Sequence, residues 1–229
     1  MMRFSTKPSR REVLWGGIYL ILFIAVLPWL VPALVYHSGI ALTEVQVNFL
    51  YFGTNFAATT LIFHKFLLQS LRDAAQVPGP TLWCAIWGYL GSTALGSFVA
   101  MFILRIEPEF ANVNDMTINA LVAENFILMA IGAVIMAPVT EELLFRGLLF
   151  RGLYDHSPLA AHLVSMVLFS SIHVSGYFGV YDVKTLALCF LQYLPAAYCL
   201  NLAYRRSGTI LAPIFMHMLI NFVALSATR

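Results

Sequence analysis

Charged residues are scarce in this sequence: Asp, Glu, Lys and Arg make up only 10% of its 229 residues, whereas 60% are hydrophobic. A soluble domain of this size needs more polar surface than that, because charged side chains normally cover it. The mean hydropathy of +0.82 therefore predicts a polytopic membrane protein. The net charge of +2 is too small to indicate nucleic-acid binding, and no basic run is interleaved with aromatic residues.

Cysteine is also rare. The three cysteines, Cys84, Cys189 and Cys199, lie in apolar segments, and no two of them have CxxC spacing. This pattern argues against a disulfide framework and against a thiolate metal site. We interpret all three as small packing residues.

Long apolar runs fill most of the chain and predict an all-α, polytopic transmembrane helical bundle of about seven to eight spans. The first is expected to be an uncleaved helix, and an eighth crossing arises only if the fourth is broken. Lys and Arg residues precede the first span and follow the second, fourth and sixth, which predicts a cytoplasmic N-terminus. The expected spans are residues 13–35, 45–71, 82–104, a fourth ending near 154, and 157–176, 185–204 and 209–225.

We expect one integrated membrane domain with two parts. Residues 1–117 form N-terminal transmembrane helices, and residues 118–229 form a catalytic helical core. No linker and no low-complexity tract separates them. In the third span Gly88, Ser92 and Gly96 recur every four residues, which predicts a smooth face for close helix packing.

Two adjacent glutamates and an arginine interrupt the fourth apolar segment, shortly after Pro138. Charge inside a membrane is costly, so such a cluster predicts a functional site. Glu142 and Arg146 are four residues apart and are expected to pair on one helix face. Glu141, about 100° further round the helix, is then left to face a cavity. Pro138 is expected to kink the helix and to free backbone carbonyls.

Two later apolar helices carry further polar groups. Phe169 and His173 share one face of the fifth helix, and His217 and Asn221 share one face of the last. Each pair alone is also consistent with packing or with hydrogen bonds between helices. Together the three helices predict one site that holds a free carboxylate, two imidazoles and a carboxamide.

One chemistry that fits these groups needs no metal and no other cofactor. Glu141 and His173 hold and deprotonate a water, which attacks an amide carbonyl. His217 and Asn221 then donate hydrogen bonds to the developing oxyanion, and one such donor is typically worth ~3 kcal/mol.

A second chemistry uses zinc, with Glu141, His173 and His217 as the ligands and water in the fourth position. That scheme needs another base, and Glu142 is the obvious candidate. Glu142, however, already has a partner in Arg146, and the sequence contains no HExxH pairing. We therefore prefer the metal-free scheme.

Taken in order, these motifs resemble those of the CPBP intramembrane protease family, which includes CAAX prenyl endopeptidases and bacterial bacteriocin-processing or immunity proteins. The resemblance covers residues 121–224, nearly half of the chain, and the first three spans resemble nothing specific. The family pattern is EExxxR, then FxxxH, then HxxxN or HxxxD, which stand here as Glu141-Glu142-Leu-Leu-Phe-Arg146, Phe169-Ser-Ser-Ile-His173 and His217-Met-Leu-Ile-Asn221.

The resemblance implies an all-helical membrane peptidase of the glutamic type, with its site in a cavity between helices. The short loops resemble bacterial members, in which prenylated CAAX substrates are not expected, and this resemblance implies a bacterial cytoplasmic membrane. The roles implied are water activation by Glu141 and His173, an oxyanion site at His217 and Asn221, and support by Glu142 and Arg146.

The predicted function is hydrolysis of a peptide bond in a membrane-anchored protein or peptide within the lipid bilayer. A non-enzymatic immunity or scaffold protein is one alternative, but such a protein has no need of Glu141. A transporter with a proton relay is another, although no paired half-repeats with broken helices are visible.

Overall fold

The computed structural model describes residues 4–227, and these residues form an all-helical bundle. The one β contact among them is an isolated bridge between Phe178 and Tyr181, so the predicted all-α class is confirmed. The helices of the first half are α1 (Arg10–Ala25), α2 (Leu27–Ser38), α3 (Glu44–Ile62), α4 (His64–Gln76), α5 (Pro78–Ile106) and α6 (Val113–Glu124).

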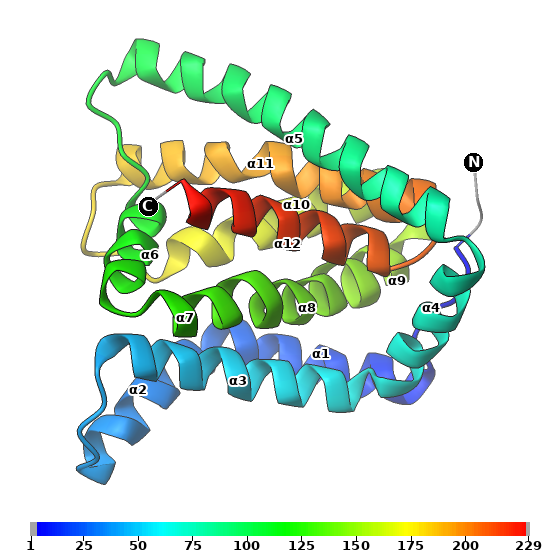
Figure 1. The fold of residues 1–229 in the computed structure, drawn as a ribbon, viewed down its shortest axis with the longest axis horizontal. Helices are drawn as coiled ribbons and strands as arrows, with labels where there is room; N and C mark the ends of the chain where they lie inside the picture. Colours follow the sequence, from blue (N-terminus) through cyan, green and yellow to red (C-terminus); the bar gives the residue numbers. More distant parts are fainter. Residues whose placement is uncertain (1–3, 228–229) are drawn as a thin grey trace.

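The second half continues with one long helical segment and three further helices. Figure 1 shows these helices in the middle of the bundle, with α5 along one flank and α1 and α3 along the other. The elements are α7 (Phe126–Met129), η1 (Ala130–Met136), α8 (Ala137–Glu141), η2 (Glu142–Phe150), α9 (Arg151–Tyr154), α10 (Pro158–Ser175), α11 (Val183–Ser207) and α12 (Leu211–Ser226).

The first two predicted spans are each divided. Between α1 and α2 the axis bends by 65°. Pro28 lies at the start of α2, where its ring excludes a helical hydrogen bond and clashes with the preceding turn, so a bend is favoured here. The second predicted span ends at Ile62, and α4 begins at His64 as a separate polar-faced helix.

The fourth segment runs as one helix of 29 residues from Phe126 to Tyr154. The prediction that it continues past the glutamates is therefore confirmed. Glu141 lies in its interior, ~20 Å from the end at Tyr154 at 1.5 Å per residue. The residues that follow Glu141 are deeply enclosed, since all of η2 except Leu149 is buried.

Two stretches of this segment, η1 and η2, have π-helical hydrogen bonding. At the end of η1 the Ala137 N–H donates to the Gly132 carbonyl, five residues back. The next N–H in this pattern would bind the Ala133 carbonyl, but Pro138 has no N–H to donate. The carbonyl of Ala133 is thus freed, as the sequence predicts for a proline at this position.

Within the described part of the chain, four helices are long and apolar enough to cross a membrane, or five if the bent pair of α1 and α2 is one span. The four are α5, the segment from α7 to α9, α10 and α11. Helix α12 is apolar but has only 16 residues. The structure thus supports a polytopic helical bundle, while the count of seven to eight crossings stays a prediction.

The two ends of the bundle differ in charge. Figure 1 shows the N-terminus, α4 and α9 at one end, and α2, α6 and the C-terminus at the other. Arg72 and Arg151 lie at the first end, where a hydrogen bond from Arg151 lowers the pKa of Asp155. At the other end Glu107 forms an ion pair with Lys184. Basic residues at the N-terminal end agree with the predicted cytoplasmic N-terminus, which itself stays a prediction.

Helix α5 packs closely on α11 and α12 at the predicted small-residue face. A Cβ atom on Gly88 would lie 2.5 Å from Met216 Sδ and 3.4 Å from Ala203 Cβ, so a larger residue would require the Met216 side chain to move. Ser92 is buried in the same face, whereas Gly96 has open space beside it. All three cysteines are free, as the sequence predicts.

Candidate active site

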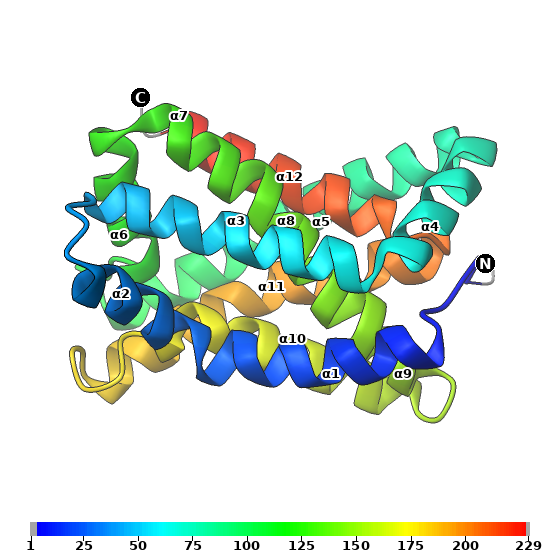
Figure 2. The same ribbon diagram turned by 90° about the horizontal axis from the view of Figure 1, so that it is seen from below.

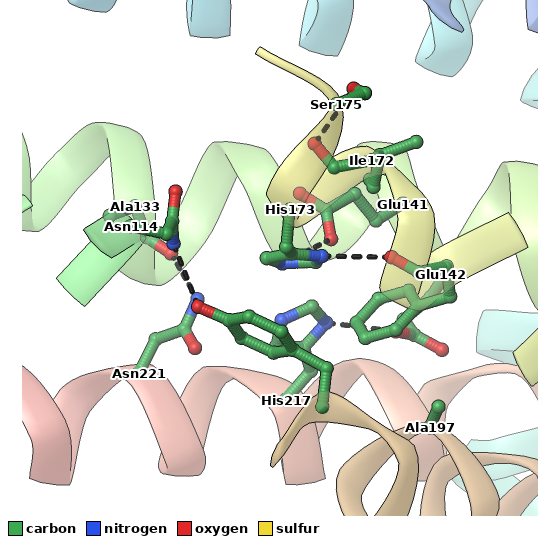
Figure 3. A network of polar contacts seen from close by, with 12 residues as sticks. Asn114, Ala133, Glu141, Glu142, Ile172, His173, Ser175, Ala197, His217 and Asn221 are labelled. Atoms are coloured by element: carbon green, nitrogen blue, oxygen red, sulfur yellow. Dashed lines mark hydrogen bonds and ion pairs between the residues drawn. The ribbon is translucent and has the colours of Figure 1, made fainter. Parts of the chain in front are cut away.

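The motif residues meet in the interior, where the fourth helical segment, α10 and α12 come together. Figure 2 shows the middle of the fourth segment crossing between α3 and the helices behind it. Figure 3 shows the side chains of Glu141 and His173 facing each other, with His217 turned toward Glu142. The structure therefore brings these four residues, which come from three separate helices, together in one cluster.

Arg146 is the centre of a buried polar network, and its own side chain is 0% exposed. Its Nη1 donates to Glu142 Oε1 at 3.0 Å, which confirms the predicted pairing. Its Nε donates to Asn201 Oδ1 at 3.1 Å, and its Nη2 donates to the Ala197 carbonyl at 3.1 Å. The guanidinium also lies 4.2 Å from the centre of the Phe169 ring. A buried charge requires such partners, and here every nitrogen has one.

Glu142 and Asn201 extend this network to two more helices. Glu142 Oε1 contacts His217 Nδ1 at 2.8 Å, so one carboxylate oxygen serves both the arginine and the imidazole. Ser165 donates to Asn201 Oδ1 at 3.1 Å and lies at the same distance from the Phe145 carbonyl. The network therefore ties η2 to α10, α11 and α12.

Glu141 and His173 lie beside this network but do not belong to it. His173 Nδ1 lies 2.8 Å from the carbonyl of Phe169. A carbonyl can only accept, so in the neutral ring Nδ1 carries the proton and Nε2 is an acceptor. Nε2 faces Glu141 Oε2 at 4.0 Å, which is too far for a direct hydrogen bond. Glu141 Oε2 is buried and has no hydrogen-bond partner.

Asn221 is placed one turn further along α12. Its Nδ2 donates to the Ala133 carbonyl at 2.8 Å, which is the carbonyl that Pro138 leaves free. The amide group has a second N–H that this bond does not use. The predicted oxyanion donor thus also fastens α12 to η1.

The residues named for zinc do not fit a metal centre as they are arranged here. Within residues 4–227, no three His, Cys, Asp or Glu side chains are grouped to hold a metal ion. His217 Nδ1 is directed at Glu142, and His173 Nδ1 at a backbone carbonyl.

Three residues of the site were not predicted from the sequence. Asn201 and Ser165 complete the network around Arg146, and Tyr193 stacks on the His173 ring. Asn201 could have been found as a lone amide in an apolar helix, because a buried arginine needs more than one partner. Ser165 and Tyr193 carry no comparable signal, since serine and tyrosine are ordinary residues in membrane helices.

A cavity of about 660 Å³ lies elsewhere, between α5 and α11. Its walls include Trp83, Gly88 and Arg206, and none of the motif residues lines it. The polar cluster of motif residues in the interior therefore lies away from this cavity.

Comparison with known proteins points to the same region. Residues 123–223 match the family model described as type II CAAX prenyl endopeptidase Rce1-like. A curated protein of Bacillus subtilis (strain 168), "Putative membrane peptidase YdiL", is 33% identical over 95 residues, which is 41% of this chain and 34% of that protein. The chain thus spans about a third of the length of that relative. No solved structure matches. The predicted resemblance to the CPBP proteases is therefore confirmed over residues 123–223, which contain all of the motif residues.

Proposed function

We propose that this protein is an intramembrane peptidase, which hydrolyses a peptide bond of a membrane-anchored protein or peptide with a water held by Glu141 and His173. The observation that carries the proposal is the 4.0 Å separation between Glu141 Oε2 and His173 Nε2. Both atoms are hydrogen-bond acceptors when the carboxylate is ionised and the imidazole is neutral. A water placed ~2.8 Å from each would donate one hydrogen to each, which is the usual way to join two acceptors at this distance.

The exposure of these two side chains suits this role. The side chain of Glu141 is 13% exposed and that of His173 is 17% exposed, whereas those of Glu142 and Arg146 are fully buried. A substrate can therefore approach the first pair without displacing the second. The network around Arg146 also holds the backbone of η2 in place, which fixes where Glu141 points.

The proposed reaction begins when Glu141 removes a proton from the water, while His173 Nε2 accepts the other hydrogen and orients the oxygen. The water oxygen bonds to the carbonyl carbon, and the electron pair of the C=O bond moves onto oxygen. When this intermediate collapses, the C–N bond breaks and Glu141 returns its proton to the departing amine. The products are a carboxylic acid and an amine, so atoms and charge balance.

Two groups on α12 are suited to stabilise the oxyanion. With Nδ1 of His217 directed at Glu142, its Nε2 can donate to the oxyanion when the ring is doubly protonated, and the negative charge that develops on the oxyanion then faces a cation. The N–H of Asn221 that Ala133 does not use is the second donor. Every step uses only the chain's own residues and one water.

The comparisons support a peptidase of this kind, and the helices support its place in a bilayer. We further propose that the protein lies in a bacterial cytoplasmic membrane with the basic end of the bundle in the cytoplasm. The basic residues at that end are what membrane topology requires of a cytoplasmic face.

The test begins with a search for the substrate. Membranes of cells that express the wild-type protein or Glu141→Gln are compared by mass spectrometry for peptides with new termini. A synthetic peptide that covers the cleaved bond is then incubated with the purified proteins. We expect Glu141→Gln to lower the cleavage rate by about 100-fold or more, because general base catalysis typically contributes ~10²–10⁴.

The matched control is Glu124→Gln, which changes an exposed glutamate at the end of α6. It should cleave like the wild type. Each protein is also assayed with a zinc chelator. Inhibition that added zinc reverses would replace the water scheme by a metalloprotease, and full activity of Glu141→Gln would make this a binding protein rather than an enzyme.

A further inference from the structure

The imidazole of His173 is held from two sides, and only one of them belongs to a motif. On the motif side, Nδ1 is bonded to the Phe169 carbonyl at 2.8 Å, and the Phe169 ring centre lies 4.8 Å away. On the other side lies Tyr193 of α11. Its ring is stacked on the imidazole with centroids 4.3 Å apart and planes 28° apart.

Tyr193 is in turn fixed by the start of α6. Its hydroxyl accepts a hydrogen bond from Asn114 Nδ2 at 3.0 Å and donates to Asp115 Oδ1 at 3.1 Å. Asn112 caps this helix through the backbone N–H groups of those two residues and also donates to Gln192 Oε1 at 2.8 Å. The phenol ring is thus held at its polar tip by one helix and at its base by another.

These contacts restrict the tilt of the His173 imidazole, which ordinary apolar packing does not. One hydrogen bond at Nδ1 leaves an imidazole free to tilt about that bond, and a tilt would swing Nε2 away from Glu141. A flat ring stacked on the imidazole removes this freedom, provided that the flat ring is itself fixed. The Tyr193 ring is fixed in this way, because its hydroxyl accepts a hydrogen bond from Asn114 and donates one to Asp115.

We propose that Tyr193 is a positioning residue of the hydrolytic site, which keeps His173 Nε2 directed at Glu141, and that the first turn of α6 holds Tyr193 in place. This inference rests on the function proposed above. It assigns a task to α6, a short helix outside the motifs whose N-cap, Asn112, is buried although it is polar.

The test compares kcat and KM for cleavage of the same synthetic peptide by Tyr193→Leu and Tyr193→Phe. Leucine removes the flat ring, and we expect kcat to fall by about 30-fold, because small misplacements of a catalytic group cost up to ~10²-fold. The KM should stay within about twofold, since the ring positions a catalytic group rather than the substrate. Phenylalanine keeps the stack and loses only the hydroxyl, so it should retain kcat within about threefold to fivefold.

Tyr198→Leu is the matched control. Tyr198 lies on the same helix and also contacts a histidine ring, that of His162 at 5.8 Å, but outside the site. Its kcat should equal that of the wild type. If Tyr193→Leu does not fold, Asn114→Ala tests the same idea from α6, because it loosens the tyrosine without opening the core. We expect kcat to fall by about twofold to threefold, no more than in Tyr193→Phe, because the bond from the tyrosine hydroxyl to Asp115 remains.

A readout without cleavage completes the test. In protein with labelled histidine, the His173 ring proton signals should shift in Tyr193→Leu, where the ring current is lost, and should stay nearly unchanged in Tyr193→Phe. Wild-type kcat in Tyr193→Leu, or equal losses in the leucine and phenylalanine variants, would refute the positioning role. Neither result touches the proposed hydrolysis, which fails only if Glu141→Gln remains active.

Discussion

The site has two halves that share one helix and differ in almost every other respect. In the half around Arg146, the side chains of Glu142 and Arg146 are 0% exposed and that of His217 is 5% exposed, and each is bonded to its neighbours. In the half around Glu141, the carboxylate is 13% exposed and faces His173 at 4.0 Å. Each glutamate has one buried oxygen, Oε2, without a hydrogen-bond partner, but Glu142 Oε1 contacts both Arg146 and His217. The two glutamates are consecutive in the sequence, so the helical rotation of ~100° separates these environments.

This difference shows how a membrane protein can use charge for two purposes within one turn. A buried network of paired charges restricts motion and limits chemical reactivity, because most of its donors and acceptors are already engaged. A carboxylate that lies outside the network and is partly exposed keeps its reactivity, but it needs a rigid support. Phe169 lies between the halves, since its ring contacts Arg146 on one side and its carbonyl binds His173 on the other. The first half therefore stabilises the fold on which the second half acts.

We expect the largest effect from Arg146→Met, which tests whether the half around Arg146 supports the fold. The change leaves Glu142 as a buried charge without its cation, and breaking a buried pair in this way typically costs ~3–5 kcal/mol. We expect the free energy of unfolding in detergent to fall by that amount, with cleavage lost in proportion to unfolded protein. The control is Arg206→Met, which removes an exposed arginine on α11 and should change stability little. Unchanged stability in Arg146→Met would show that the network does not support the fold.

A smaller effect is expected from Glu142→Gln. Glutamine keeps one acceptor for Arg146 but removes the negative charge, and hydrogen bonds to charged groups are worth ~1.5–3 kcal/mol. Unfolding measured by tyrosine and tryptophan fluorescence should show this loss of stability. Glu141→Gln, assayed in parallel, should unfold like the wild type although its cleavage rate collapses. If both variants lost stability equally, the division between a supporting and a reacting glutamate would be wrong.

The sequence predicted those parts of the site that depend on spacing within one helix. Glu142 and Arg146 had to meet because they are four residues apart, and the cost of burying charge indicated that His173 and His217 would lie in one site with Glu141. The contact between Arg146 and Asn201 spans 55 residues, so it depends on how α11 packs against η2. No local pattern encodes that packing, and for this reason the second partner of the arginine was missed.

The same limit explains the differences in the fold. Hydropathy treats residues 13–35 as one span, because the bend between α1 and α2 changes direction and not polarity. The helix α6 was not predicted, since its polar N-terminal turn looks like a loop until Tyr193 is placed against it. Hydropathy also gives no indication of the π-helical turns, because these turns shift backbone hydrogen bonds by one residue without a change in composition.

We expect the smallest effect from Ser165→Ala. This variant tests whether the hydrogen bonds in the half around Arg146 act cooperatively. The serine hydroxyl donates to Asn201, whose Oδ1 also accepts from Arg146. Hydrogen bonds of this kind within membranes average ~0.6 kcal/mol, so the free energy of unfolding should fall by about that amount if the bond acts alone. A loss above about 2 kcal/mol would instead show that Asn201 holds Arg146 only when Ser165 holds Asn201.

Cleavage by the folded protein should be unchanged in either case, because Ser165 touches neither Glu141 nor His173. A fall in kcat without a fall in stability would mean that the two halves are coupled more tightly than their separate bonding indicates.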